Sequence, residues 1–142
     1  MQTKTASGKT PHLLLATRLG HTFADAGLLQ RALTHRSFSA DHNERLEFLG
    51  DRILNITMAD WLFKEFPQAL EGELAKRHAA LISQPVLAEI ARTMRVGEML
   101  ILGKGEESTG GREKPSMLAD AVEAVLAAVY LDQGMEEARR II

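Results

Sequence analysis

Five carboxylates stand in two groups whose spacing could hold a metal ion. Glu44, Glu47 and Asp51 belong to the stretch NERLEFLGDRIL, and Asp120 and Glu123 belong to MLADAVEAVLAAVYL. Spacings of three, four and seven residues place the members of each group on one narrow face of a helix. Like charges at this spacing repel each other. If the two faces met, they would offer oxygen ligands only, which suits Mg²⁺ or Mn²⁺ better than zinc.

The helices expected to carry these carboxylates are largely apolar. Leu46, Leu49 and Ile53 form an apolar stripe on the first helix, and residues 117–131 hold no charged side chain besides the two carboxylates. A helix that is apolar all round belongs at the centre of a helical domain. An ionised carboxylate is costly there unless it is paired, hydrogen-bonded or bound to a metal.

Other residues leave one alternative open and suggest no different chemistry. Arg36, Arg45 and Arg52 could neutralise part of the acidic charge, which would make the carboxylates structural. We expect His35 to be hydrogen-bonded within the fold and His78 to lie on the surface, because neither has a Ser or Cys partner at a spacing typical of catalysis.

Helical periodicity extends over most of the chain and predicts an all-α domain. Apolar spacings of three and four residues run through 12–20, 27–35, 43–66, 71–83 and 85–97. Pro67 ends the third of these segments, and the alternation expected of β-strands is missing. Residues 103–116 are predicted to form one long flexible loop, and Pro115 to begin the helix that follows.

Length and composition indicate one soluble domain in a reducing compartment. The 142 residues contain no cysteine, no secretory signal and no apolar segment long enough to span a bilayer, so we expect a cytoplasmic protein without a membrane partner. The formal net charge is −2, whereas dedicated nucleic-acid binders usually carry a basic excess. Any polyanionic partner must therefore be held by local charge or by a metal.

Four segments, in this order along the chain, resemble the catalytic domain of bacterial ribonuclease III. They are ALTHRSFS, HNERLEFLGDRIL, EGELAKRHAALIS and LADAVEAVLAAVYLD, and the similarity covers roughly residues 12–142. The resemblance implies the all-α endonuclease fold of that family, a homodimer and dependence on Mg²⁺, for which Mn²⁺ can substitute. It also implies cleavage of double-stranded RNA with 5′-phosphate and 3′-hydroxyl ends, including precursor ribosomal RNA.

The resemblance further implies roles for individual residues. The metal ligands would be Glu47, Asp51, Asp120 and Glu123, and the catalytic residues would be Asp51 and Glu123 with Glu44 and Glu71 as auxiliary acids. Phe48 would insert into the partner subunit of the dimer. The alternative is a catalytically idle RNA-binding or assembly module of the same fold, against which the presence of every expected carboxylate argues.

Two features depart from the family pattern. Arg52 stands beside Asp51 where a small residue such as Ser is usual. Family members also normally continue into a separate domain that binds double-stranded RNA, and these 142 residues do not contain it. We therefore expect a flexible tail over 1–11 and a catalytic domain over 12–142, without the RNA-binding domain.

Overall fold

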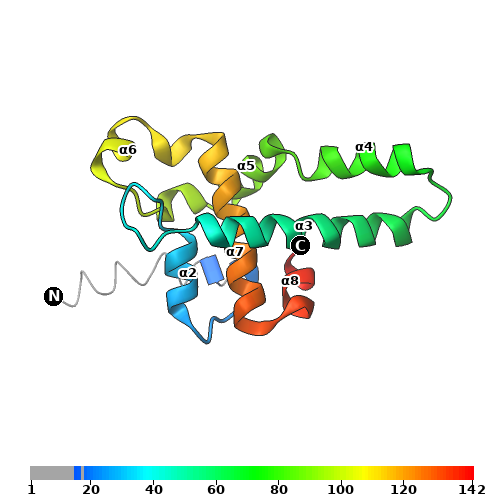
Figure 1. The fold of residues 1–142 in the computed structure, drawn as a ribbon, viewed down its shortest axis with the longest axis horizontal. Helices are drawn as coiled ribbons and strands as arrows, with labels where there is room; N and C mark the ends of the chain where they lie inside the picture. Colours follow the sequence, from blue (N-terminus) through cyan, green and yellow to red (C-terminus); the bar gives the residue numbers. More distant parts are fainter. Residues whose placement is uncertain (1–14, 17) are drawn as a thin grey trace.

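Helix α7 lies at the centre of the computed structural model, which describes residues 15–16 and 18–142 (Figure 1). Ten of the 19 residues of α7 are buried, as predicted for a helix that is apolar on all sides. The α7 residues Ala121, Ala124, Ala127 and Ala128 are completely buried, and their small side chains allow neighbouring helices to approach closely. The predicted tail over 1–11 lies outside the described residues, as does the predicted start of the domain at residue 12.

The helices that surround α7 confirm the predicted all-α class. In chain order, the elements are α2 (Ala26–Ala32), α3 (Glu44–Glu65), α4 (Glu71–Leu81), α5 (Gln84–Thr93), the 3₁₀ helix η1 (Val96–Met99), α6 (Lys104–Ser108), the 3₁₀ helix η2 (Gly111–Glu113), α7 (Pro115–Gln133) and α8 (Met135–Ile141). Within the part of the chain that the structure describes there is no strand, only an isolated parallel bridge between Thr34 and Ile101.

Helices α3 and α4 form a hairpin that extends beyond the rest of the fold (Figure 1). The first half of α3 crosses α7, and α4 returns beside the second half of α3. His78 on α4 is half-buried, and its Nε2 donates to the carbonyl oxygen of Asn55 on α3 at 3.1 Å. His78 is therefore not fully on the surface, as predicted, but partly covered, and its ring bonds α4 to α3.

The segment predicted to be one long loop, residues 103–116, contains two short helices, α6 and η2. Arg112 holds the segment in place by donating from Nη1 to the carbonyl oxygens of Gly97, at 2.9 Å, and Leu100, at 2.7 Å. Lys114 pairs with Glu106 across the same segment at 2.8 Å. The prediction of a flexible loop is wrong here because contacts that are distant in sequence order the chain. Pro115 does begin α7, as predicted.

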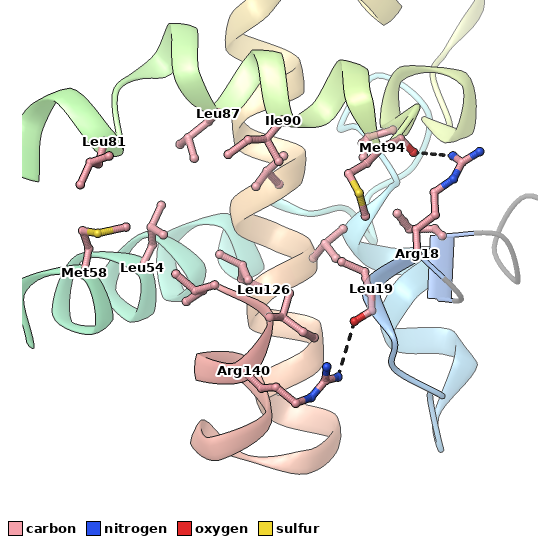
Figure 2. Close-up of a pocket in the computed structure, with 16 residues that line it drawn as sticks. Arg18, Leu19, Leu54, Met58, Leu81, Leu87, Ile90, Met94, Leu126 and Arg140 are labelled. Atoms are coloured by element: carbon pink, nitrogen blue, oxygen red, sulfur yellow. Dashed lines mark hydrogen bonds between the residues drawn. The ribbon is translucent and has the colours of Figure 1, made fainter. Parts of the chain in front are cut away.

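An apolar cavity of about 310 Å³ lies between α3, α5, α7 and α8 (Figure 2). Leu54, Leu87 and Leu126 line it, together with Arg18 and Arg140. None of the predicted acidic residues does so, which means that the cavity and the acidic cluster are separate features. Among the helices that the structure describes, none is both long enough and apolar enough to cross a membrane.

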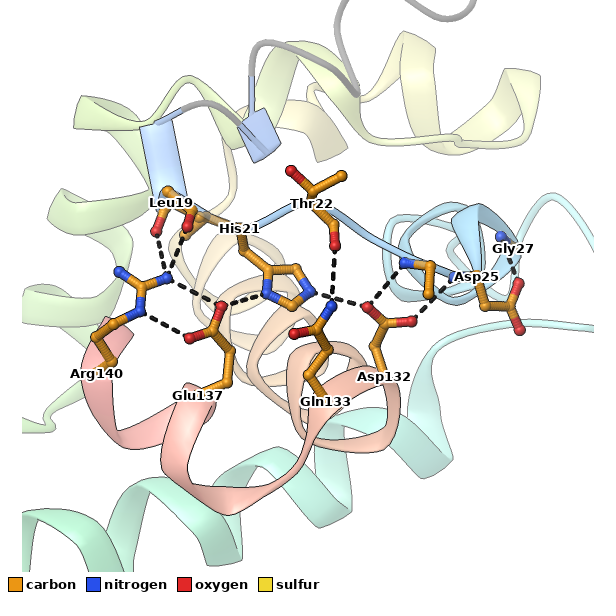
Figure 3. Close-up of polar contacts among 11 residues, drawn as sticks. Leu19, His21, Thr22, Asp25, Gly27, Asp132, Gln133, Glu137 and Arg140 are labelled. Carbon is orange, nitrogen blue, oxygen red and sulfur yellow. Dashed lines mark hydrogen bonds and ion pairs between the residues drawn. The ribbon is translucent and has the colours of Figure 1, made fainter.

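A polar network fastens the turn before α2 to the ends of α7 and α8 (Figure 3). His21 is buried, with Nδ1 2.7 Å from Glu137 Oε2 and Nε2 2.9 Å from Asp132 Oδ2. Asp132 also accepts a hydrogen bond from the backbone N–H of Asp25 at 2.9 Å. Arg140 completes the network through its Nε, 2.7 Å from Glu137 Oε1. These contacts fix the C-terminal end of α7, the helix that carries two of the predicted metal ligands.

Candidate metal centre

The acidic faces of α3 and α7 meet where the two helices cross. Glu47 on α3 and Asp120 and Glu123 on α7 each place a carboxylate oxygen within 4.8 Å of the others. We call these three residues the central carboxylates. Glu123 is only 8% exposed, and the other two are half-buried. The structure thus brings together, from positions more than 70 residues apart in sequence, three of the four residues predicted to bind metal.

Gly50 allows α3 and α7 to approach closely enough to form this cluster. A Cβ atom at position 50 would lie 1.6 Å from the carbonyl oxygen of Glu123, which no side chain can tolerate without separating the helices. Gly50 is not among the residues predicted from the sequence. An isolated glycine inside a helical pattern was the available signal, because such a residue often has a packing reason for its presence.

Asn43 fixes the start of α3, where the first acidic residues lie. Its buried Nδ2 donates to the carbonyl oxygen of Ala32 at 3.1 Å. Its backbone N–H donates to the carbonyl oxygen of Thr34 at 2.9 Å. The carbonyl oxygen of Asn43 accepts from the N–H of Glu47. Sequence reasoning missed this role, because an Asn before a helix suggests a local cap and not a bond to another helix.

Burial raises the pKa of all three central carboxylates, and neighbouring like charges raise that of Glu47 and Glu123 further. Burial, followed by the charge of Asp120 and a hydrogen bond to it, raises the pKa of Glu47 to about 7. Burial, followed by a hydrogen bond to Asp51 and the charge of that residue, raises the pKa of Glu123 to about 8. Burial also raises the pKa of Asp120. The site therefore holds negative charge at a cost, which a bound cation would remove.

In the part of the chain that the structure describes, the flanking carboxylates form ion pairs and the central ones form none. Arg36 lies 3.5 Å from Glu44, and Arg52 donates to Asp51. Among the described residues no ion pair involves a central carboxylate. The ion-pair alternative thus accounts for Glu44 and Asp51 but leaves the central carboxylates without an ion pair among the described residues.

The remaining predicted site residues lie at different distances from this centre. Asp51 contacts Glu123, and Glu44 is exposed one helical turn before Glu47. Glu71 begins α4 at the opposite end of the hairpin. It follows the end of α3, which is about 27 Å along the helix axis from Glu47 at 1.5 Å per residue. A single chain does not bring Glu71 to the cluster, so its auxiliary role stays a prediction.

Phe48 and His35 occupy the surroundings of the cluster. Phe48 is 62% exposed, and the guanidinium carbon of Arg52 lies 4.7 Å from the centre of its ring. His35 is hydrogen-bonded within the fold, as predicted, with Nδ1 2.8 Å from Ser37 Oγ. The His35 ring therefore stabilises a local turn through Ser37.

Comparison with known proteins identifies the family. A sequence model described as Ribonuclease-III-like matches residues 25–142. The chain belongs to the Ribonuclease-III-like family. A family member named Ribonuclease 3, from Nitrosococcus oceani, is 52% identical over 128 residues, which are 90% of this chain and 55% of that protein. The chain spans about half the length of the curated relatives it matches.

Solved structures of other proteins share the fold. The nuclease domain of ribonuclease III from Campylobacter jejuni is 43% identical, with a TM-score of 0.88 over 90% of each chain. Dicer from Pichia stipitis is 28% identical, with a TM-score of 0.61 over 81% of this chain and 49% of its own. The acidic cluster therefore lies in a nuclease-domain fold.

Proposed function

We propose that this ribonuclease III family chain is a metal-dependent endonuclease domain that hydrolyses double-stranded RNA and leaves 5′-phosphate and 3′-hydroxyl ends. The observation that carries the proposal is the group of three central carboxylates within 4.8 Å of one another, which form no ion pair among the described residues. Its natural substrates would include precursor ribosomal RNA. The cytoplasmic location expected from the sequence stays a prediction.

The chemistry of the donors suits Mg²⁺, with Mn²⁺ as a substitute. All the donors are carboxylate oxygens, and hard cations prefer oxygen ligands. The residues that would hold the metal are Glu47, Asp51, Asp120 and Glu123. Bound there, divalent ions would lower the pKa of an attacking water and neutralise charge on the leaving 3′ oxygen.

The raised pKa values of Glu47 and Glu123 should make cation binding depend on pH. Because the pKa values of Glu47 and Glu123 are raised to about 7 and about 8, both residues hold protons over part of the neutral range. Metal ligands must be deprotonated, so cation affinity should increase as the pH rises to about 8. Asp51 and Glu123 would contact the reacting groups, while Glu44 would contribute negative charge from the edge of the cluster.

We propose that the domain acts as a homodimer through the exposed face of α3. Phe48, Ile56 and Phe63 are 62%, 55% and 69% exposed, and their spacing places them on one side of the helix. Contiguous exposed apolar side chains mark interaction surfaces. The Campylobacter jejuni structure is described as flexible in a region involved in dimer formation. A two-fold dimer would present two identical acidic sites to one duplex, and a second copy could also bring Glu71 to the cluster.

Phe48→Ala tests this assembly, because it removes the largest exposed apolar side chain near the acidic cluster. We expect the dimer to dissociate at higher protein concentration than the wild type in analytical ultracentrifugation. Leu131→Ala, which removes a side chain that is 51% exposed on α7, should leave the dissociation constant unchanged. A wild-type chain that is monomeric at every concentration would contradict the proposal.

A cleavage assay on end-labelled duplex RNA tests the activity. We expect cleavage of both strands with Mg²⁺ or Mn²⁺ and none with a chelator. The new 5′ ends should be sensitive to phosphatase, and the new 3′ ends should be substrates for ligation. Binding of the duplex without cleavage at any concentration of either metal would instead support the idle RNA-binding module.

A further inference from the structure

Arg52 is held against the acidic cluster by two residues of its own helix. Its Nη1 donates to Oδ2 of Asp51, the preceding residue. Its guanidinium carbon lies 4.7 Å from the centre of the Phe48 ring, one turn earlier. A planar guanidinium can stack on an aromatic ring and bond a carboxylate at the same time. Because all three residues lie on α3, formation of the helix is enough to bring them together.

The carboxylate that Arg52 occupies lies directly beside the centre of the cluster. Asp51 contacts Glu123, the most buried acidic residue of the site. The other arginine that pairs with the cluster, Arg36, reaches Glu44, which is exposed at the outer edge. Of the two arginines that pair with acidic residues of the cluster, Arg52 therefore has the partner nearer to the central carboxylates.

We infer that Arg52 is a resident counter-ion that competes with a divalent cation for Asp51, and so sets the metal concentration that the site requires. This inference rests on the metal site of the proposed function. Arg52 acts through Asp51 and is a positioning residue. The Arg52 side chain is 64% exposed, so the guanidinium can turn into solvent when Asp51 is needed as a ligand.

Two opposite effects follow from removing the charge at position 52. Without the guanidinium, the Asp51 carboxylate loses its cationic partner at the edge of an acidic cluster, so the metal-free protein becomes less stable. A divalent cation no longer has a competitor and is no longer repelled by a nearby positive charge, so it binds more tightly. Exposed ion pairs are weak, which limits the expected gain to about two- to fivefold in the dissociation constant.

The experiment compares Arg52→Gln with Arg45→Gln and Arg52→Lys. Arg45 is exposed on the same helix and has no ion pair among the described residues, so it controls for net charge. Dissociation constants for Mg²⁺ and Mn²⁺ are measured by calorimetry, and melting temperatures are measured with a chelator and with Mg²⁺. Protein concentrations are chosen so that sedimentation finds every variant in the same association state.

We expect Arg52→Gln to bind metal about two- to fivefold more tightly and to melt at a lower temperature with the chelator. Arg52→Lys should restore most of the wild-type behaviour, and Arg45→Gln should change the affinity less than Arg52→Gln does. Unchanged or weaker metal binding by Arg52→Gln, or an equal gain in Arg45→Gln, would overturn the inference alone. If the wild type and all variants fail to bind either metal, the proposed function falls together with the inference.

Discussion

At the scale of single residues, Glu123 is the most buried carboxylate of the cluster and lies close to other carboxylates. Its pKa is raised to about 8, mainly by burial and then by Asp51, whereas an ordinary glutamate has a pKa of 4.5. The native metal-free protein therefore binds more protons than the unfolded chain between pH 4.5 and about 8. The free energy of unfolding should fall as the pH rises through this window.

Glu123→Gln should remove this pH dependence, because the amide keeps the shape of the side chain without its charge. With a chelator present, we expect the variant to melt about 3–7 °C above the wild type at pH 8, the shift that about 1–2 kcal/mol produces in a domain of this size. The difference should vanish below pH 4.5, where both states of the wild type are protonated. Thermal denaturation at pH 4, 6 and 8 provides the measurement.

The same substitution separates a metal ligand from a structural carboxylate. Mg²⁺ should raise the melting temperature of the wild type and leave that of Glu123→Gln nearly unchanged. Cleavage of duplex RNA should be lost in the variant. Cleavage that survives at low Mg²⁺ would contradict the assignment of Glu123.

The sequence was sufficient to predict which carboxylates come together in the acidic cluster but not the residues that position them. Glu47, Asp120 and Glu123 could be predicted because their spacing and apolar surroundings are local properties of each helix. Gly50 and Asn43 have their partners on α7 and α2, so nothing in the neighbouring sequence reveals these contacts. Which residues pair with arginine, and which do not, likewise depends on side chains placed by the fold.

At the scale of elements, the packing of α3 on α7 determines the geometry of the site. Gly50→Ala should destabilise the protein by about 3 kcal/mol, because the added methyl group overlaps the α7 backbone and overpacking of this kind costs 1–3 kcal/mol or more. Any folded fraction should bind Mg²⁺ more weakly, since the two acidic faces are pushed apart. Chemical denaturation and calorimetry provide the two measurements.

Gly72→Ala is the matched control for this prediction. Gly72 lies in α4, and a Cβ atom there would meet nothing within 4 Å. Alanine favours a helix over glycine by about 0.5–1 kcal/mol, so this variant should be slightly more stable than the wild type. Equal stability changes in the two variants would show that the close approach at Gly50 is not essential.

The network around His21 makes a separate contribution that depends on pH. The hydrogen bond from Arg140, and then that from His21, lowers the pKa of Glu137 to about 2. Because the native state favours the ionised carboxylate, the stabilisation is complete above pH 4.5 and is lost as the pH falls toward 2. Glu137→Gln should therefore lower the melting temperature at pH 7, and the deficit should shrink in acid.

Glu136→Gln controls for the change in net charge. Glu136 is exposed on the same helix and has no ion pair among the described residues. It should melt close to the wild type at both pH 7 and pH 3. An equal deficit in the two variants would mean that the network around His21 adds no stability of its own.

Helix boundaries were predictable where local signals are strong. The predicted helix over 43–66 forms as Glu44–Glu65. Its start was predictable because the apolar periodicity begins there, and its end because Pro67 cannot continue a helix. The segment 103–116 was mispredicted as a flexible loop, because its short helices depend on Arg112 bonding the carbonyls of Gly97 and Leu100. A loop-like composition does not show that distant partners will order a segment.

At the scale of the whole molecule, charge limits what the 142 residues can do with a nucleic acid. The chain has 17 Lys and Arg against 19 Asp and Glu. Contacts to phosphates supply most of the affinity for a duplex, and each contact is weakened by salt. Affinity for RNA should therefore depend on the cations held by the acidic cluster and on a few local arginines.

We predict that this chain cleaves duplex RNA at low ionic strength and loses the activity steeply as salt rises. A fusion to a domain that binds double-stranded RNA, through a flexible linker, should restore cleavage at physiological salt, because the linker raises the effective concentration of RNA at the site. The catalytic residues are the same in both proteins, so Glu123→Gln should inactivate each. The measurement is the cleavage rate against salt concentration for the chain and for the fusion. Coincident curves would show that these residues capture RNA by themselves, and that an additional RNA-binding domain is not what the activity requires.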